Sequence, residues 1–95
     1  MLMGKVIGTV VASQKDYRLQ GLKLLVLEQV NHQAIPSGST VVAVDSVGAG
    51  VGEIVLYAAG SSARLTDITE GKPVDTVIVA IVDTVEKEGT VTYQK

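Results

Sequence analysis

Stretches rich in Val, Ile and Leu alternate with short polar or glycine-rich stretches along the whole chain. The apolar stretches have the lengths of β-strands, and the stretches between them carry the Gly, Pro, Asn and Asp residues that favour turns. The sequence therefore predicts strands over residues 5–12, 22–30, 40–47, 53–58, 75–85 and 90–93.

One stretch, residues 60–65, has the composition of a short helix, with Ser61 or Ser62 as its N-cap. Residues 87–89 predict a turn that makes residues 90–93 the second strand of a C-terminal β-hairpin, and residues 36–38 predict a turn before the third strand. The chain has no room for the long helical crossovers that parallel strands usually need. We therefore expect one all-β domain over residues 1–95: a small, closed or nearly closed antiparallel five-stranded barrel with one short helix and a C-terminal hairpin extension.

Several predicted strands are apolar on both faces, most clearly residues 24–27, 54–57 and 77–82. An antiparallel barrel in water should instead alternate between apolar and polar positions. Leaving two or three outward aliphatic side chains exposed on each of three strands would cost on the order of 10 kcal/mol. The pattern therefore predicts that a second copy of the chain covers the outside of the barrel.

Composition narrows the function classes. Val, Ile and Thr form about a third of the 95 residues, which suits a pleated sheet. Zero cysteines exclude a disulfide framework and thiol chemistry, and a net charge of −2 disfavours nucleic-acid binding. The longest apolar run, residues 77–82, is too short to span a bilayer, so the expected protein is soluble and cytosolic with no membrane partner.

Few residues suggest chemistry. In a dinucleotide-binding fingerprint that starts at Gly48 and Gly50, the third glycine would stand where the chain has Glu53, and a long helix would follow. The chain has neither, so we interpret the glycines over residues 48–52 as a tight bend. Ser61 and Ser62 could be nucleophiles only with His32 as a base, and no acid is placed to orient it. A single histidine in a polar loop is no metal site, and we expect His32 to be solvated. No catalytic residue, metal site or cofactor is predicted.

Two carboxylates flank the glycines. Asp45 and Glu53 could in principle do acid–base work, but capping backbone N–H groups or pairing with Arg64 is the simpler interpretation. An anion at the Ser61–Ser62 helix start, aided by Arg64, is physically allowed. A single-stranded nucleic acid would need a basic groove with aromatic platforms, whereas the chain has three separated tyrosines.

Four stretches taken together resemble a known family. Residues 43–56 (AVDSVGAGVGEIVL) are followed by GSSAR at residues 60–64, by residues 73–83 (PVDTVIVAIVD), and preceded by residues 4–12 (GKVIGTVVA). In this order they resemble the EutN/CcmL family across nearly the whole chain. That family consists of vertex proteins of bacterial microcompartments, the protein shells around carboxysomes and catabolic organelles.

The resemblance implies an OB-like β-barrel subunit in a cyclic homopentamer with a narrow central pore and no catalytic activity. It implies hexameric shell proteins as further partners and a location in the shell, within the cytoplasm. The loop over residues 45–53 would approach a neighbouring subunit or the fivefold axis, and Arg64 could form an ion pair with Asp45 or Glu53 within or across subunits. The candidate interface or pore-loop residues are Asp45, Gly48, Ala49, Gly50, Gly52, Glu53, Ser61, Ser62 and Arg64.

Two other classes remain open from the residues alone. One is a small OB-type binding module for a nucleotide, a peptide or a single strand, and the other is a small enzyme. A monomeric state at micromolar concentration would favour the module, and turnover lost on mutating Ser62 would favour the enzyme.

Overall fold

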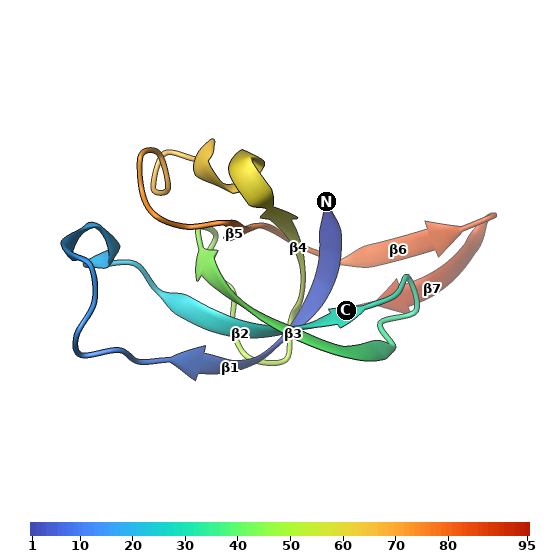
Figure 1. Ribbon diagram of the computed structural model, residues 1–95. Coiled ribbons are helices and arrows are strands. Elements are labelled where there is room, and N and C mark those ends of the chain that lie inside the picture. The colour runs from blue at the N-terminus through green and yellow to red at the C-terminus, as the bar shows by residue number, and fades with distance from the viewer.

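The computed structural model describes residues 1–95 as a closed five-stranded barrel with a separate two-stranded hairpin projecting from one end (Figure 1). The barrel order is β1-β2-β3-β5-β4, and the hairpin pairs β6 with β7. This confirms the predicted barrel and its C-terminal hairpin. The elements are β1 (Leu2–Val10), η1 (Tyr17–Leu19), β2 (Leu24–Val30), β3 (Pro36–Asp45), β4 (Ile54–Ala59), η2 (Gly60–Arg64), β5 (Thr76–Ile81), β6 (Thr84–Lys87) and β7 (Thr90–Gln94).

The expectation of purely antiparallel pairing is wrong at one seam. β3 and β5 run parallel and pair only at Val44 with Val77 and at Asp45 with Ile78. A parallel pair needs a crossover of a dozen residues or more, and that crossover is usually helical. Here residues 46–75 provide it with strand β4 and the 3₁₀ turn η2, so no long helix is required.

Two predicted strand boundaries also move. The expected turn at residues 36–38 is the start of β3, which begins at Pro36, a position where a missing N–H is tolerated. The chain turns earlier, at Asn31, whose side-chain oxygen accepts hydrogen bonds from the N–H groups of Gln33 (2.8 Å) and Ile35 (3.1 Å). The predicted strand over residues 75–85 is two strands, because the chain leaves the barrel at Val82 and Asp83.

The inner core consists of strand residues that point into the barrel, together with one residue, Ala49, from the connection between β3 and β4. At Gly4 a Cβ would stand 3.0 Å from Cε1 of the Tyr57 ring, so a side chain there would require the ring to shift. Burial raises the pKa of the Tyr57 phenol above its usual value. The core residues are Val6, Leu25, Leu27, Ala43, Ala49, Val55, Tyr57 and Ile78.

Two further apolar clusters lie outside this core, and the chain covers both of them itself. Val44 and Val77 pack against Ala63 of η2. At the other end, Val30, Ile54 and Val82 pack with Val85 and Tyr93 of the hairpin, among others. The expectation that all of the outer cover comes from another copy is therefore wrong for these two strips, because η2 and the hairpin fold back onto them.

The molecule is elongated, with extents of 46 × 23 × 21 Å. The hairpin forms one end of the long axis, and η1 with the loop after η2 lies toward the opposite end (Figure 1). None of the helices has both the length and the apolar character that crossing a membrane requires.

Candidate functional site

The glycine loop, defined here as residues 45–53, joins β3 to β4. Ala49, only 1% exposed, enters the inner core beside Val6 and Val55. The loop is fixed to β1 because Gly52 donates to the Val6 carbonyl (2.8 Å) and the Val6 N–H donates to the Glu53 carbonyl (3.0 Å). The loop is therefore part of the packed barrel rather than a free surface loop.

Asp45 holds the first turn of the glycine loop. Its side chain is 3% exposed, and Oδ1 accepts hydrogen bonds from the N–H groups of Val47 and Gly48, both at 3.1 Å. Lys23 Nζ lies 3.9 Å from Asp45 Oδ2 and donates to the Ala49 carbonyl (3.2 Å). The predicted capping role of this carboxylate is confirmed.

Glu53 holds the second turn. Oε1 accepts a hydrogen bond from the Gly50 N–H (2.6 Å), and Oε2 accepts one from Lys95 Nζ (2.9 Å). The hydrogen bond from Lys95, followed by that from the Gly50 N–H, lowers the pKa of Glu53 below its usual value. Glu53 thereby links the glycine loop to the C-terminal residue of the chain.

Positive φ angles explain two glycines of the loop. Gly48 has φ +79° and Gly52 has φ +95°, a region that side chains with a Cβ rarely adopt. Gly50 has no positive φ; its N–H donates to Glu53 Oε1, and a Cβ added at this position would lie 3.4 Å from the same oxygen atom. These turns direct Val47 and Val51 outward, where both are exposed.

The residues of η2 are placed differently from the prediction. Ala59, not Ser61 or Ser62, occupies the N-cap position, and no side chain caps the turn. Ser62 Oγ instead donates to the Ala59 carbonyl (2.9 Å), and Ser61 is exposed. The N-cap prediction is wrong because β4 runs directly into a 3₁₀ turn at Gly60, which leaves no extended serine before the first helical residue.

Arg64 does not pair with either carboxylate within one subunit. Its Nη1 donates to the Val74 carbonyl (3.2 Å), so it ties η2 to the segment that enters β5. The carboxylates of Asp45 and Glu53 are matched by Lys23 and Lys95 instead. No hydrogen bond or ion pair joins η2 to the glycine loop, so the candidate residues fall into two separate groups.

His32 is not solvated as expected. It is half-buried, its Nδ1 is buried without a hydrogen-bond partner, and its carbonyl accepts a hydrogen bond from Thr92 Oγ1 (2.8 Å). The cause is the C-terminal hairpin, which returns over the turn after β2. A contact between residues 60 positions apart leaves no local signal in the sequence.

The geometry of these residues supports structural roles. Both carboxylates of the glycine loop accept hydrogen bonds from backbone N–H groups, and each lies beside a lysine. No group of three or more His, Asp or Glu side chains converges anywhere in the structure to suggest a metal site. The arrangement fixes the shape of one barrel end and leaves two valines on its surface.

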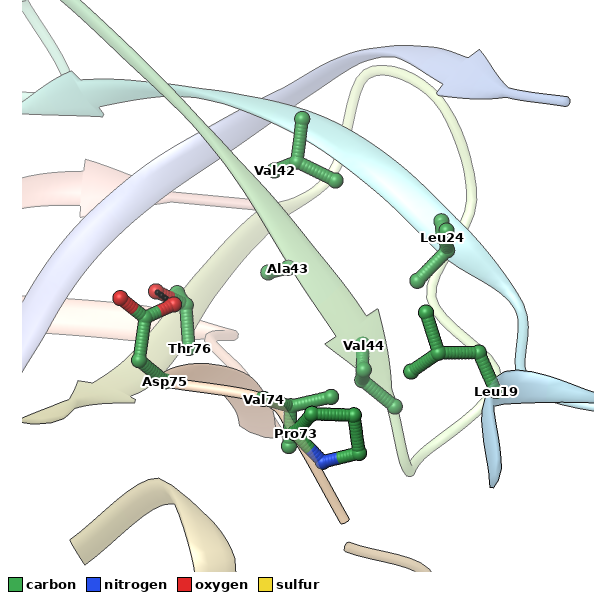
Figure 2. A pocket seen from close by; sticks show the side chains of 9 residues that line it. All are labelled: Leu19, Leu24, Val42, Ala43, Val44, Pro73, Val74, Asp75 and Thr76. Carbon is green, nitrogen blue, oxygen red and sulfur yellow. Dashed lines mark hydrogen bonds between the residues drawn. The ribbon is translucent and has the colours of Figure 1, made fainter. Parts of the chain in front are cut away.

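Sequence reasoning missed one surface feature, which we call the groove. It is an apolar hollow of about 180 Å³ on the outside of the barrel, between β3 and the segment entering β5. Figure 2 shows Leu24, Val42 and Val44 on one side of it and Pro73 and Val74 on the other. The outward apolar positions of β2 and β3 signalled it, but the opposite wall comes from a distant segment. The lining residues are Leu19, Leu24, Val42, Ala43, Val44, Pro73, Val74, Asp75 and Thr76.

Comparison with known proteins places this geometry among shell proteins. Residues 1–83 match the family described as ethanolamine utilisation protein EutN/carboxysome. The chain is 52% identical to the bacterial microcompartment shell vertex protein GrpN of Rhodospirillum rubrum over 90% of this chain and 97% of that protein. It is 40% identical to the microcompartment shell vertex protein EutN of Escherichia coli K12 over the full length of both.

Solved structures agree with the sequence matches. The structure of CcmL from Gloeobacter violaceus superposes with a TM-score of 0.96 at 42% identity, covering 100% of this chain and 98% of that one. The GrpN structure, described as a pentameric microcompartment shell protein, superposes with a TM-score of 0.84, and the match covers 92% of this chain and 99% of that one. The family match and the full-length identity together show that this chain belongs to the EutN/CcmL family.

Proposed function

We propose that this chain is a structural subunit of a bacterial microcompartment shell, where five copies form a cyclic ring that occupies a shell vertex. The observation that carries the proposal is its 52% identity to GrpN, a pentameric microcompartment shell protein with the same barrel. The carboxylates of the glycine loop already bind backbone N–H groups and lysines of the same chain, which supports a structural role without catalysis.

The physical role follows from geometry. A sheet of hexagonal tiles is flat and cannot close, whereas a fivefold unit introduces the curvature that closes it. Hexameric shell proteins are therefore the proposed neighbours of the ring. A cyclic ring also requires a heterologous interface, in which one surface of each subunit meets a different surface of the next.

The glycine loop is the proposed approach to the neighbouring subunit or to the fivefold axis. Gly48 and Gly52 have no side chain to keep a neighbouring backbone away, and Val47 and Val51 of the same loop are exposed. The η2 residues Ser61, Ser62 and Arg64 form the second proposed interface group.

Co-expression with hexameric shell proteins tests the shell function. With this chain present we expect closed polyhedral particles by electron microscopy, and without it open sheets or tubes. Equal closure with and without the chain would remove the vertex role.

Arg64→Ala tests the interface role of η2. Arg64 is exposed and makes only one hydrogen bond within the subunit, so the variant should lose assembly, measured by sedimentation, more than thermal stability. Unchanged assembly would exclude Arg64 from the interface. Lys72→Ala, on the segment after η2 and not in an ion pair, is the matched control.

A further inference from the structure

His32 carries the one buried side-chain nitrogen or oxygen of the molecule that has no hydrogen-bond partner, its Nδ1. It is also the only histidine of the chain. Buried polar atoms in folded proteins are nearly always hydrogen-bonded, so an exception calls for an explanation. Imidazole is in addition the side chain whose charge ordinarily changes in mild acid. His32 is therefore the residue through which a modest change of pH acts on this structure.

The C-terminal hairpin closes over the turn that carries this histidine, residues 31–35, which we call the His32 turn (Figure 1). Thr92 Oγ1 on β7 donates to the His32 carbonyl (2.8 Å). The pairing of β6 with β7 skips Thr92 and so makes it a bulge residue. A bulge is a common device for directing one side chain out of the regular strand pattern. Here it directs the threonine hydroxyl to the His32 turn.

Few contacts hold the hairpin on the barrel. Val85 and Tyr93 pack in the apolar cluster at its base, and Lys95 Nζ lies 2.9 Å from a carboxylate oxygen of Glu53. The bond from Thr92 is the link to the His32 turn. β6 and β7 pair with no strand of the barrel, and an isolated two-stranded hairpin is only marginally stable in water. The loss of one contact therefore shifts the balance between a docked and an undocked hairpin.

Protonation of His32 is unfavourable while the hairpin is docked. A neutral imidazole carries an N–H on one nitrogen only, whereas the imidazolium carries one on both. In the docked state the cation would place an N–H at Nδ1, where the structure has no acceptor, and would bury part of its charge. Once the hairpin has moved away, water can accept that hydrogen bond. Acid therefore favours the undocked hairpin.

No charged group near the His32 turn compensates for such a cation, because no carboxylate forms an ion pair with the imidazole. Glu53 already pairs with Lys95, Glu28 is the direct neighbour of Lys5 in the pairing of β1 with β2, and tyrosine phenols are neutral in mild acid. The remaining groups are exposed. The charged and titratable groups on the elements packed against the turn are the N-terminal amine, Lys5, Glu28, Glu53, Tyr57, Asp83, Glu86, Lys87, Glu88, Tyr93 and Lys95.

We propose that His32 is an acid-sensitive latch for the C-terminal hairpin: with a neutral imidazole the hairpin stays docked on the His32 turn, and protonation of the imidazole releases it. All of the contacts lie within one subunit, so the inference goes beyond the proposed shell function and does not depend on it. The pKa of Glu53 is lowered, so its ion pair with Lys95 persists in mild acid and does not cause the release.

Hydrogen–deuterium exchange of the full chain, read by mass spectrometry in neutral buffer and in mild acid, tests the latch. Protection is expressed relative to a free peptide at the same pH, which removes the pH dependence of the exchange chemistry. Between about pH 7.5 and about pH 5.5, protection of residues 84–95 should fall about tenfold, because a one-proton equilibrium changes about tenfold for each pH unit below the ordinary imidazole pKa of about 6.5. Protection of residues 24–28 in β2 should not change.

Variants at the histidine identify the group responsible. His32→Phe keeps a ring that cannot be protonated, so its hairpin protection should be the same at both pH values, and His32→Asn serves in its place if that variant does not fold. The matched control His32→Phe/Gln33→His moves the only histidine to the adjacent exposed position and should also show no change. Equal hairpin protection at both pH values in the native chain overturns the latch, and so does a tenfold loss in His32→Phe or in the control.

Discussion

The glycine loop and the C-terminal hairpin show two ways in which this small barrel uses residues outside its five strands. The loop enters the core with Ala49, is hydrogen-bonded to β1 and to Lys23, and is held internally by the bond from the Gly50 N–H to Glu53. The hairpin forms its own sheet and contacts the barrel through a few side chains at its base. The loop is therefore packed as part of the barrel's folding unit, whereas most of the hairpin is exposed surface that a partner can reach.

The largest expected effect separates the two regions by burial. Ala49→Asp places a carboxylate among Val6, Val55 and their neighbours with no partner, which should destabilise the fold by about 3–5 kcal/mol. Val91→Asp makes the same kind of change on the exposed hairpin and should alter stability by less than about 0.5 kcal/mol. Urea unfolding measures both, and similar losses would show that the loop and the hairpin are equally integrated.

The next effect concerns the cap of the loop. Asp45→Ala removes the acceptor for the Val47 and Gly48 N–H groups and should cost about 2 kcal/mol. Asp45→Asn keeps an acceptor oxygen and should cost less than half of that. Equal losses from the two variants would mean that the charge, rather than the hydrogen bonds, holds the turn.

A smaller effect is expected from backbone strain. Gly52→Ala places a Cβ at φ +95°, where nothing crowds it but the conformation itself costs about 1–2 kcal/mol. Gly8→Ala, also in open space but without a positive φ, is the matched control and should change the free energy of unfolding little. Thermal melting of both variants separates strain from packing, since equal melting temperatures would remove strain as the explanation.

The smallest effect concerns the link between the two regions. Lys95→Met removes the partner of Glu53 Oε2 and should lower the melting temperature slightly near neutral pH, whereas Lys87→Met, at the last residue of β6, should not. The pKa of Glu53 is lowered in the folded state, so its contribution is full above the ordinary glutamate pKa. That contribution disappears as the pH falls through the lowered pKa.

The difference between the native chain and Lys95→Met should therefore vanish in acid. Melting curves recorded across the acidic range measure it. A difference that persists below the lowered pKa of Glu53 would show that Lys95 acts through something other than this ion pair.

The sequence predicted features that local chemistry determines. The strand positions, the hairpin turn and the capping by Asp45 follow from apolar spacing, turn residues and short-range hydrogen bonds. The family resemblance, carried by residues 4–12, 43–56, 60–64 and 73–83, is confirmed by the match over residues 1–83.

The features that sequence reasoning missed depend on contacts between distant segments. The parallel pairing of β3 with β5, the partner of Glu53 at Lys95 and the buried Nδ1 of His32 each join residues far apart in the chain. The same holds for the outer cover: apolar spacing showed that the barrel needed one, but not that η2 and the hairpin supply two parts of it. The interface roles of the glycine loop and of η2 stay predictions.

The central claim is that the uncovered apolar surface of the barrel is shared between copies in a ring. Native mass spectrometry of the purified, unmodified chain at micromolar concentration tests it most directly. We expect a dominant species at five times the 9.9 kDa subunit mass. A species that stays at one subunit mass as the concentration rises would contradict it.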